Sequence, residues 1–125
     1  MSRGITLDTG ALIALERRRD RMLRLLRASV EQRLPVTIPV VVLAEWWRSR
    51  TDLREAILAS MLVEPMDERL GRTAGAALAA VRGATAVDAI VMASAARRDD
   101  VVLTSDVEDM TRLAAHFRSV RVLGV

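Results

Sequence analysis

The chain has 125 residues, of which 51% are hydrophobic and 28% are charged, values that are typical of one compact globular domain. No apolar run approaches the roughly 20 residues that a membrane-spanning helix needs, and no secretory signal pattern opens the sequence. The absence of cysteine excludes disulfides, thiol nucleophiles and thiolate metal sites. We therefore expect a single cytoplasmic domain over residues 1–125, with no membrane association.

The basic residues are unusual because all 19 of them are arginine. The net charge is only +3, and the pI of about 11.1 is high because the chain has no lysine, tyrosine or cysteine to titrate below the guanidinium groups. The missing lysine excludes a P-loop and a Schiff-base enzyme. The single histidine, His116, excludes a ribonuclease mechanism that needs two histidines, and we expect it to lie at the surface or to cap a helix.

Apolar, β-branched runs alternate with helical patterns along the chain. In chain order the predicted elements are a strand over 5–8, helices over 10–17 and 20–31, a strand over 36–39, helices over 40–50 and 52–59, a strand over 61–65, helices over 67–81 and 86–97, a strand over 101–104, a helix over 107–116 and a strand over 120–123. This alternation predicts an α/β fold with three layers, in which helices cover both faces of a mainly parallel five-stranded sheet. Sites in such sheets form at the carboxyl ends of the strands.

Five acidic residues follow predicted strands or lie early in predicted helices. Asp8 ends the first strand in "LDTG", and Asp106 follows the fourth in "VVLTSD", with Asp109 three residues later. Glu45 in "LAEWW" and Asp88 in "AVDAIVMASA" interrupt segments that otherwise look buried. Because buried carboxylates without a partner are costly, a cluster of them needs a cation. Oxygen donors without nitrogen or sulfur favour Mg²⁺ or Mn²⁺.

Each of these acids also has a purely structural interpretation. The alternatives are a turn or cap acceptor for Asp8, a capping box of Thr85 with Asp88, an ion pair of Glu45 with Arg48, an N-cap for Asp106 and a first-turn acid for Asp109. The placement of all five near one edge of the predicted sheet nevertheless favours a metal site.

Two further patterns involve basic and aromatic side chains. Arg17, Arg21 and Arg24 are spaced as one stripe of a helix, which indicates either a solvated face or a contact with phosphate. Trp46 and Trp47 are adjacent, so a helix turns them about 100° apart. We expect one tryptophan in the core and the other at a partner groove.

Taken together, the acidic motifs resemble those of PIN-domain nucleases. The segments that carry the resemblance are "LDTGALIAL", the glutamate in "LAEWW", "AVDAIVMASA" and "VVLTSDVEDM". The length and the strand–helix order are similar to those of VapC-type toxins of bacterial toxin–antitoxin pairs in particular, over essentially the whole chain. The resemblance implies Mg²⁺- or Mn²⁺-dependent cleavage of single-stranded RNA regions, a cognate antitoxin partner and a toxin homodimer.

Position by position, the resemblance places the acidic quartet of the family on Asp8, Glu45, Asp88 and Asp106. Thr104 matches the hydroxyl residue before the last acid, and Asp109 matches an extra acid that only some members have. We hypothesise that Asp8 and Asp88 are the most direct metal ligands, with Asp106 and Glu45 completing the shell or orienting water. The tandem tryptophan and the absence of lysine depart from the family pattern and concern substrate contacts.

Other functions fit parts of the pattern. A DNA-acting nuclease is the nearest alternative, because the acids do not distinguish sugars and RNA recognition rests on 2′-hydroxyl contacts. A noncatalytic receiver-like module also gathers acids around magnesium, but it needs a lysine. A phosphatase with an aspartate nucleophile needs a second acid two residues after Asp8, where Gly10 stands. For the antitoxin, we expect a segment that covers the helices near residues 10–31 and the tryptophan helix.

Overall fold

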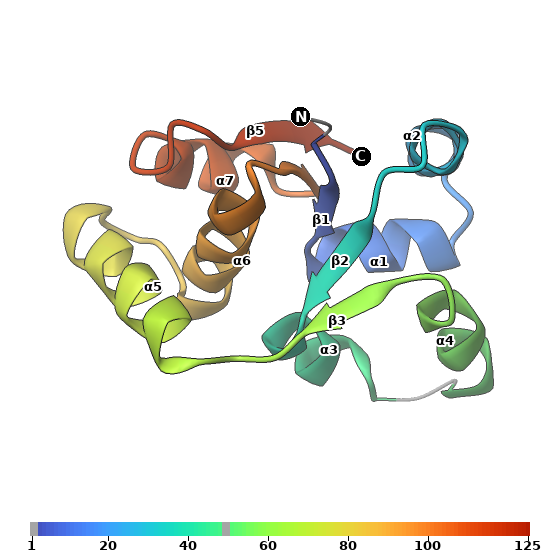
Figure 1. Ribbon diagram of the computed structural model, residues 1–125, viewed down its shortest axis with the longest axis horizontal. Helices are drawn as coiled ribbons and strands as arrows, with labels where there is room; N and C mark the ends of the chain where they lie inside the picture. Colours follow the sequence, from blue (N-terminus) through green and yellow to red (C-terminus); the bar gives the residue numbers. More distant parts are fainter. Residues whose placement is uncertain (1–2, 49–50) are drawn as a thin grey trace.

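The computed structural model describes residues 3–48 and 51–125. Five strands form one sheet in the order β3-β2-β1-β4-β5, and every pairing is parallel (Figure 1). The strands are β1 (Ile5–Leu7), β2 (Val36–Pro39), β3 (Leu62–Glu64), β4 (Val101–Thr104) and β5 (Arg121–Gly124). The α/β prediction is confirmed, and the sheet is wholly parallel where the sequence predicted a mainly parallel one.

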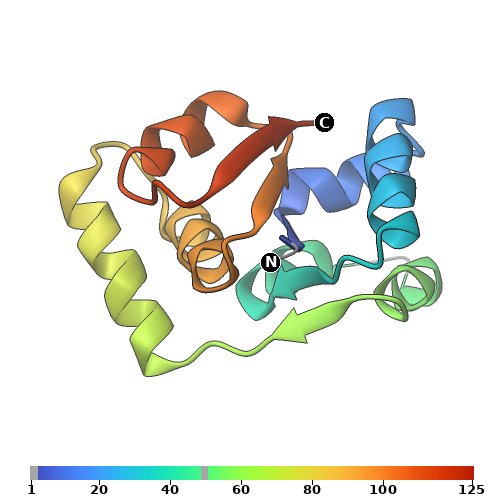
Figure 2. The ribbon, with the colours of Figure 1, turned by 45° about the horizontal axis from the view of Figure 1, so that its top comes forward.

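Seven helices of the described residues flank the sheet. They are α1 (Thr9–Glu16), α2 (Asp20–Glu31), α3 (Val40–Trp46), α4 (Thr51–Leu58), α5 (Glu68–Ala80), α6 (Ala86–Arg98) and α7 (Val107–Ala114). Helix α1 packs on β1 and β4, and α6 packs on β1, β2 and β4 from the other side (Figure 1). Helix α5 lies along the outer side of α6 (Figure 2). Within the described ranges, no helix is long and apolar enough to cross a membrane.

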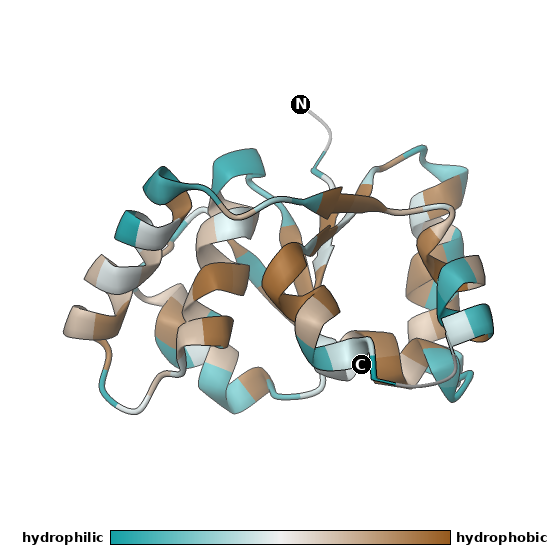
Figure 3. Cartoon of the chain, turned by 90° about the horizontal axis from the view of Figure 1, so that it is seen from below, coloured by the Kyte–Doolittle hydropathy of each residue, from teal (hydrophilic) through white to brown (hydrophobic). Residues whose placement is uncertain are grey.

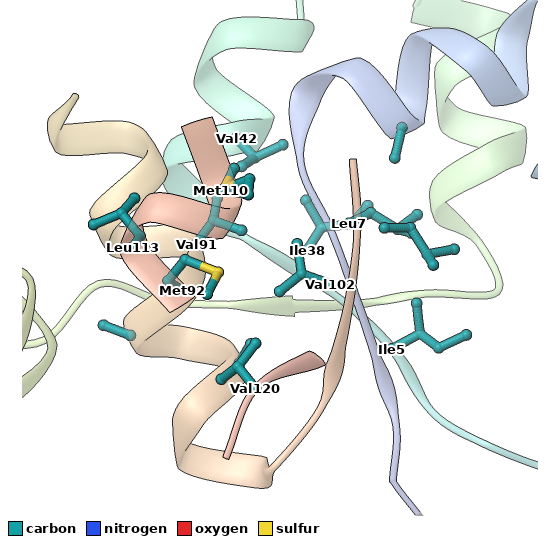
Figure 4. Packing of buried hydrophobic residues seen from close by; sticks show 14 of the residues in the cluster. Ile5, Leu7, Ile38, Val42, Val91, Met92, Val102, Met110, Leu113 and Val120 are labelled. Carbon is teal, nitrogen blue, oxygen red and sulfur yellow. The ribbon is translucent and has the colours of Figure 1, made fainter. Parts of the chain in front are cut away.

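The central strands are buried on both faces, which explains why they read as almost continuous apolar runs. All three residues of β1 and all four of β2 are buried. Leu7 and Ile38 on these strands, and Val91 and Met92 on α6, are fully excluded from solvent (Figure 4). Hydrophobic residues concentrate on the central strands and on the helix sides that face them (Figure 3). The core therefore holds the carboxyl ends of β1 and β4 side by side.

The helix predicted over 40–50 is shorter than expected. Helix α3 ends at Trp46, and Trp47 leaves the helix with φ −80° and ψ 67°. The carbonyl of Trp46 accepts hydrogen bonds from the backbone N–H of Arg48 and from Nη1 of Arg54 on α4. Residues 49 and 50, the last two of the predicted helix, lie outside the described residues.

The predicted stripe of Arg17, Arg21 and Arg24 is wrong, because the chain is not one helix across these positions. Helix α1 ends at Glu16 and α2 begins at Asp20. Between them Arg18 adopts a left-handed φ of 54°, and the turn is closed by bonds from its N–H and that of Arg19 to the last residues of α1. Arg17 therefore lies in the turn after α1, whereas Arg21 and Arg24 lie on α2.

Candidate active site

The site forms where β1 and β4, two hydrogen-bonded neighbours, end at the same edge of the sheet. Leu7 is paired with Leu103, and the backbone N–H of Asp8 donates to the carbonyl of Leu103 over 3.3 Å. Thr104 is the last residue of β4, and its Oγ1 accepts a 2.8 Å hydrogen bond from the N–H of Asp106. Parallel pairing thus brings the two predicted strand-end acids to neighbouring positions.

Asp8 is the most buried acid of the site, with 6% of its surface exposed. Its Oδ1 accepts a 2.8 Å hydrogen bond from the N–H of Ala11 and so caps α1. Burial raises the pKa of Asp8 to about 6, against the opposing effect of hydrogen bonds from Thr104 and Ala11. The nearby carboxylates of Asp88 and Asp106 raise this pKa further. A carboxylate with such a pKa gains from a cation that replaces its lost hydration.

Asp88 enters the site from the first turn of α6. The Oγ1 of Thr85, the N-cap residue, accepts a 3.2 Å hydrogen bond from the N–H of Asp88, so the threonine rather than the aspartate side chain caps this helix. Partial burial raises the pKa of the Asp88 carboxyl, and the charges of Asp106, Asp109 and Glu45 raise it further, while a hydrogen bond with Thr85 lowers it. The structure therefore brings Asp88 within electrostatic reach of the other predicted acids.

Glu45 is contributed by α3, near the end of β2. Its Oε1 accepts a 2.6 Å hydrogen bond from the hydroxyl of Thr9. Because Thr9 follows Asp8 directly in the chain, this bond ties α3 to the start of α1 beside the buried aspartate. Thr9 was not among the predicted site residues; the hydroxyl immediately after the strand-end acid was the available signal.

Asp106 and Asp109 form the exposed side of the site. Asp106 is the N-cap of α7, and its Oδ1 accepts a 3.4 Å hydrogen bond from the N–H of Asp109. The hydrogen bond between the two carboxyls raises the pKa of Asp106 and lowers that of Asp109, which also pairs with Arg112. Since Asp109 already has a cationic partner, its charge is less available to a ligand than that of the other acids.

The structural interpretations of several acids are also correct, and they do not compete with a ligand role. Asp8 and Asp106 do cap helices, yet each carboxylate has more acceptor positions than one N–H occupies. Capping also does not explain why like charges gather at one edge. In the described part of the chain, no arginine forms an ion pair with Asp8, Asp88 or Asp106. The site therefore carries an excess of negative charge.

The donors fit a hard divalent cation by their chemistry, because all of them are oxygen atoms with surplus negative charge. Within residues 3–48 and 51–125, however, no three acidic or histidine side chains are arranged to hold one ion together. Mg²⁺ usually keeps several waters and needs only one or two protein carboxylates. The donor set is consistent with that mode of binding.

The remaining candidates have clear positions. Trp46 is buried at 2% exposure and Trp47 is partly exposed, so one tryptophan lies in the core as expected. His116 is exposed and stacks edge-on against Phe117, with ring centroids 5.0 Å apart, which confirms a surface position.

Comparison with known proteins places this geometry in a family. The model of the PIN domain family matches residues 5–115 of the chain. A comparison with curated proteins finds no match.

Among solved structures, the chain is similar to VapBC from Salmonella typhimurium in complex with DNA, at 14% identity, with 98% of each chain covered and a TM-score of 0.79. It is similar to VapBC2 from Rickettsia felis bound to a promoter DNA fragment, at 12% identity, with 97% and 98% covered and a TM-score of 0.75. A toxin–antitoxin complex from Klebsiella pneumoniae shares 19% identity, with 94% and 95% covered and a TM-score of 0.70. These likenesses concern the fold.

Proposed function

Since the chain belongs to the PIN domain family, we propose that it is a single-domain, divalent-metal-dependent endoribonuclease that cleaves single-stranded regions of RNA. Family membership supports nuclease activity. The observation that carries the proposal is the gathering of Asp8 and Asp106, at the ends of β1 and β4, with Asp88 from the first turn of α6, without an arginine partner in the described residues. Two like charges 4 Å apart repel each other by roughly 4 kcal/mol at an effective dielectric of 20. A cation bound between the carboxylates would relieve this repulsion.

In this proposal Asp8 and Asp88 would hold the cation, which is Mg²⁺ or Mn²⁺, and Asp106 would be a further ligand through a bound water molecule. Such an ion would supply a bound water of lowered pKa and positive charge beside the phosphate. Glu45, fixed by the hydroxyl of Thr9, orients water at the reacting phosphate. Thr104 holds the backbone that carries Asp106 through its bond to the Asp106 N–H, and Asp109 has an auxiliary role.

The test combines cleavage with thermal stability. Purified protein is incubated with single-stranded RNA and DNA oligonucleotides in Mg²⁺, Mn²⁺ or EDTA, and its melting temperature is recorded in each condition. We expect RNA cleavage only with metal, and a higher melting temperature because the ion binds the folded state. Asp8→Asn should remove most of that increase, while Glu68→Gln, at an exposed first-turn acid of α5, should keep it.

Two results would change the assignment. Cleavage of DNA in preference to RNA would favour the DNA-acting nuclease, since the acids themselves do not select the sugar. Metal-independent cleavage, or no thermal shift at millimolar Mn²⁺, would reject the metal site.

We further propose that the chain is the toxin of a toxin–antitoxin pair and acts in the cytoplasm. The similar solved structures are toxin–antitoxin complexes, and the chain has an apolar groove of about 360 Å³ between α3 and α4. It is lined by Val40, Leu43, Ala44, Trp47, Glu55 and Leu58. The groove shares the tryptophan helix with the surface predicted for the antitoxin, adds α4 to it, and is suited to an amphipathic helix.

Coexpression with the neighbouring open reading frame tests this partner. We expect the two proteins to copurify, and Trp47→Asp to weaken the complex because it places a charge in the groove. If expression of the chain is not toxic and the two proteins do not copurify, the toxin role is wrong, while the nuclease proposal is unaffected.

A homodimer is also proposed, through the edge of the sheet at β3. Leu62 and Val63 on this edge strand, and Met66 beyond it, are 60%, 39% and 44% exposed. An exposed apolar edge strand is a ready surface for association. Sedimentation analysis of the wild type and of Leu62→Lys tests it, with a shift to monomer expected in the variant.

A further inference from the structure

A hollow of about 570 Å³ lies beside the acidic site, between the α1–α2 turn and the loop after β4. Its lining includes Gly10 and Ser105. Gly10 lies two residues after Asp8, and Ser105 directly precedes Asp106. The two segments approach so closely that a Cβ on Gly10 would lie 1.8 Å from Oγ of Ser105. The wall of the hollow is therefore continuous with the backbone that carries two acids of the site.

The opposite wall is strongly basic. Arg17, Arg19 and Arg21 line the hollow, and Asp20 is the one acidic side chain of the lining. All three arginines are exposed, and Arg17 and Arg19 form no ion pair with any carboxylate in residues 3–48 and 51–125. Unpaired guanidinium groups that share a hollow repel one another, and an anionic ligand relieves that repulsion.

The backbone holds these arginines in place. The N–H groups of Arg17 and Arg19 donate to the carbonyls of Ile13 and Ala14, each over 3.0 Å. Nε of Arg21 donates to the carbonyl of Gly124 over 2.6 Å, which fixes its side chain against the end of β5. A hydrogen-bonded turn that displays several guanidinium groups toward one space is suited to oxygens of consecutive phosphates, which Arg binds in a bidentate manner.

Resting on the proposed nuclease function, we propose that this hollow binds the sugar–phosphate backbone of the substrate strand next to the cleaved bond, with Arg17 and Arg19 as phosphate contacts. An acidic pocket by itself repels a polyanion, so substrate binding needs positive charge beside it. The contacts are to phosphate and carry no sequence preference. They hold the strand so that the scissile phosphate reaches the carboxylates.

The experiment compares Arg17→Gln, Arg19→Gln and the double variant with Arg27→Gln, whose arginine is exposed on α2 outside the lining of the hollow. Affinity for a labelled single-stranded RNA oligonucleotide is measured in EDTA from low to high salt. Each single hollow variant should bind about fivefold more weakly near 0.1 M salt, with the logarithmic salt slope smaller by about 0.7, and the double variant should lose about 1.4 from the slope. With Mg²⁺, KM should rise while kcat stays close to the wild-type value.

The outcomes separate this inference from the function on which it rests. If the wild type cleaves RNA but the hollow variants keep their affinity, salt slope and KM, the inference is wrong and the nuclease proposal stands. Equal losses in Arg27→Gln would also reject it, because general charge would then explain binding. Weakened antitoxin binding with unchanged oligonucleotide binding would assign the hollow to an acidic protein segment instead. If the wild type binds RNA in EDTA through Arg17 and Arg19 yet cleaves nothing, the hollow stands and the nuclease proposal fails.

Discussion

Thr6 lies on β1 and Asp8 follows this strand directly, but the carboxylates at these two positions have opposite surroundings. The carboxylate beside Thr6 is paired with an arginine, whereas Asp8 lies near other carboxylates. Oγ1 of Thr6 donates a hydrogen bond to Oδ2 of the buried Asp100 over 2.8 Å, and Arg98 forms an ion pair with the same carboxylate. Arg98 contacts Asp100 over 2.9 Å, pairs with Glu64 on β3 and donates to Thr6 over 3.0 Å. Around Asp8, by contrast, the neighbouring charges are carboxylates that raise its pKa.

The difference shows that this fold is able to place an arginine beside a buried acid. Arg98 comes from the last turn of α6, and Asp88 from the first turn of the same helix. One end of α6 therefore supplies the cation that balances two acids, and the other end adds a further acid to an unbalanced group. The unbalanced end costs stability in the absence of a ligand, which is the usual property of a binding site.

The largest effect is expected for Asp88→Asn. As a metal ligand, Asp88 should be needed for chemistry, so cleavage should fall by about 1,000-fold, which is roughly 4 kcal/mol in the barrier. The metal-free melting temperature should hold or rise, because one charge leaves a repelling cluster. Cleavage rates and melting curves in EDTA measure both. If the variant melts early but still cuts RNA, the residue is structural.

At the balanced end, Arg98→Met should lower the free energy of unfolding by about 3 kcal/mol, because it leaves Asp100 buried without its cation. Denaturant unfolding measures the loss. Arg97→Met is the matched control, since Arg97 pairs with the exposed Asp67 and an exposed pair contributes much less to stability than a buried one. Similar losses in the two variants would show that Arg98 does not balance a buried charge.

A pH titration of the metal-free protein sharpens the contrast. The pKa of Asp8 is raised from 3.8 to about 6, so the folded protein binds this proton more tightly than the unfolded chain does. The stabilising effect is complete below about pH 4 and is lost as the pH rises through about 6. Between pH 4 and pH 7 the free energy of unfolding of the wild type should therefore fall by up to about 3 kcal/mol relative to that of Asp8→Asn.

Asn also serves well as an N-cap, so α1 keeps its cap in the Asp8→Asn variant and only the titrating group is removed. Parallel stability curves for the two proteins would disprove the raised pKa. Saturating Mg²⁺ should reduce the loss of wild-type stability with rising pH, because the ion stabilises the charged form of Asp8.

The smallest effect is expected at Asp109, one turn into α7. Because Arg112 already pairs with it, Asp109→Asn should reduce the cleavage rate only about threefold to tenfold, well below the loss expected when a metal ligand is removed. Single-turnover rates of this variant and of Asp88→Asn provide the comparison. Equal losses in both would place Asp109 among the principal ligands.

The helices and strands, and the position of the acids along them, could be predicted from the local pattern of residues. Apolar runs such as "ITL" and "VTIP" became buried strands because their residues suit a sheet covered on both faces. Asp8 and Asp106 were predicted at strand ends, and the rule that parallel strands end at one edge was sufficient to bring them together. Glu45 and Asp88 were identified by their unlikely place in apolar segments, a signal that is local and therefore readable.

The pairing of charges, in contrast, could not be predicted, because it depends on how distant segments pack together. "ARRDD" does not reveal that Arg98 and Asp100 turn inward to Thr6 and Glu64, since those partners are 34 or more positions distant in the chain. Likewise Arg17 and Arg21 share a hollow because a turn at Arg18 redirects the chain, and not because they share a helix face. The energy of an ion pair depends on the distance between two side chains in space, and that distance exists only once the sheet and its helices have packed.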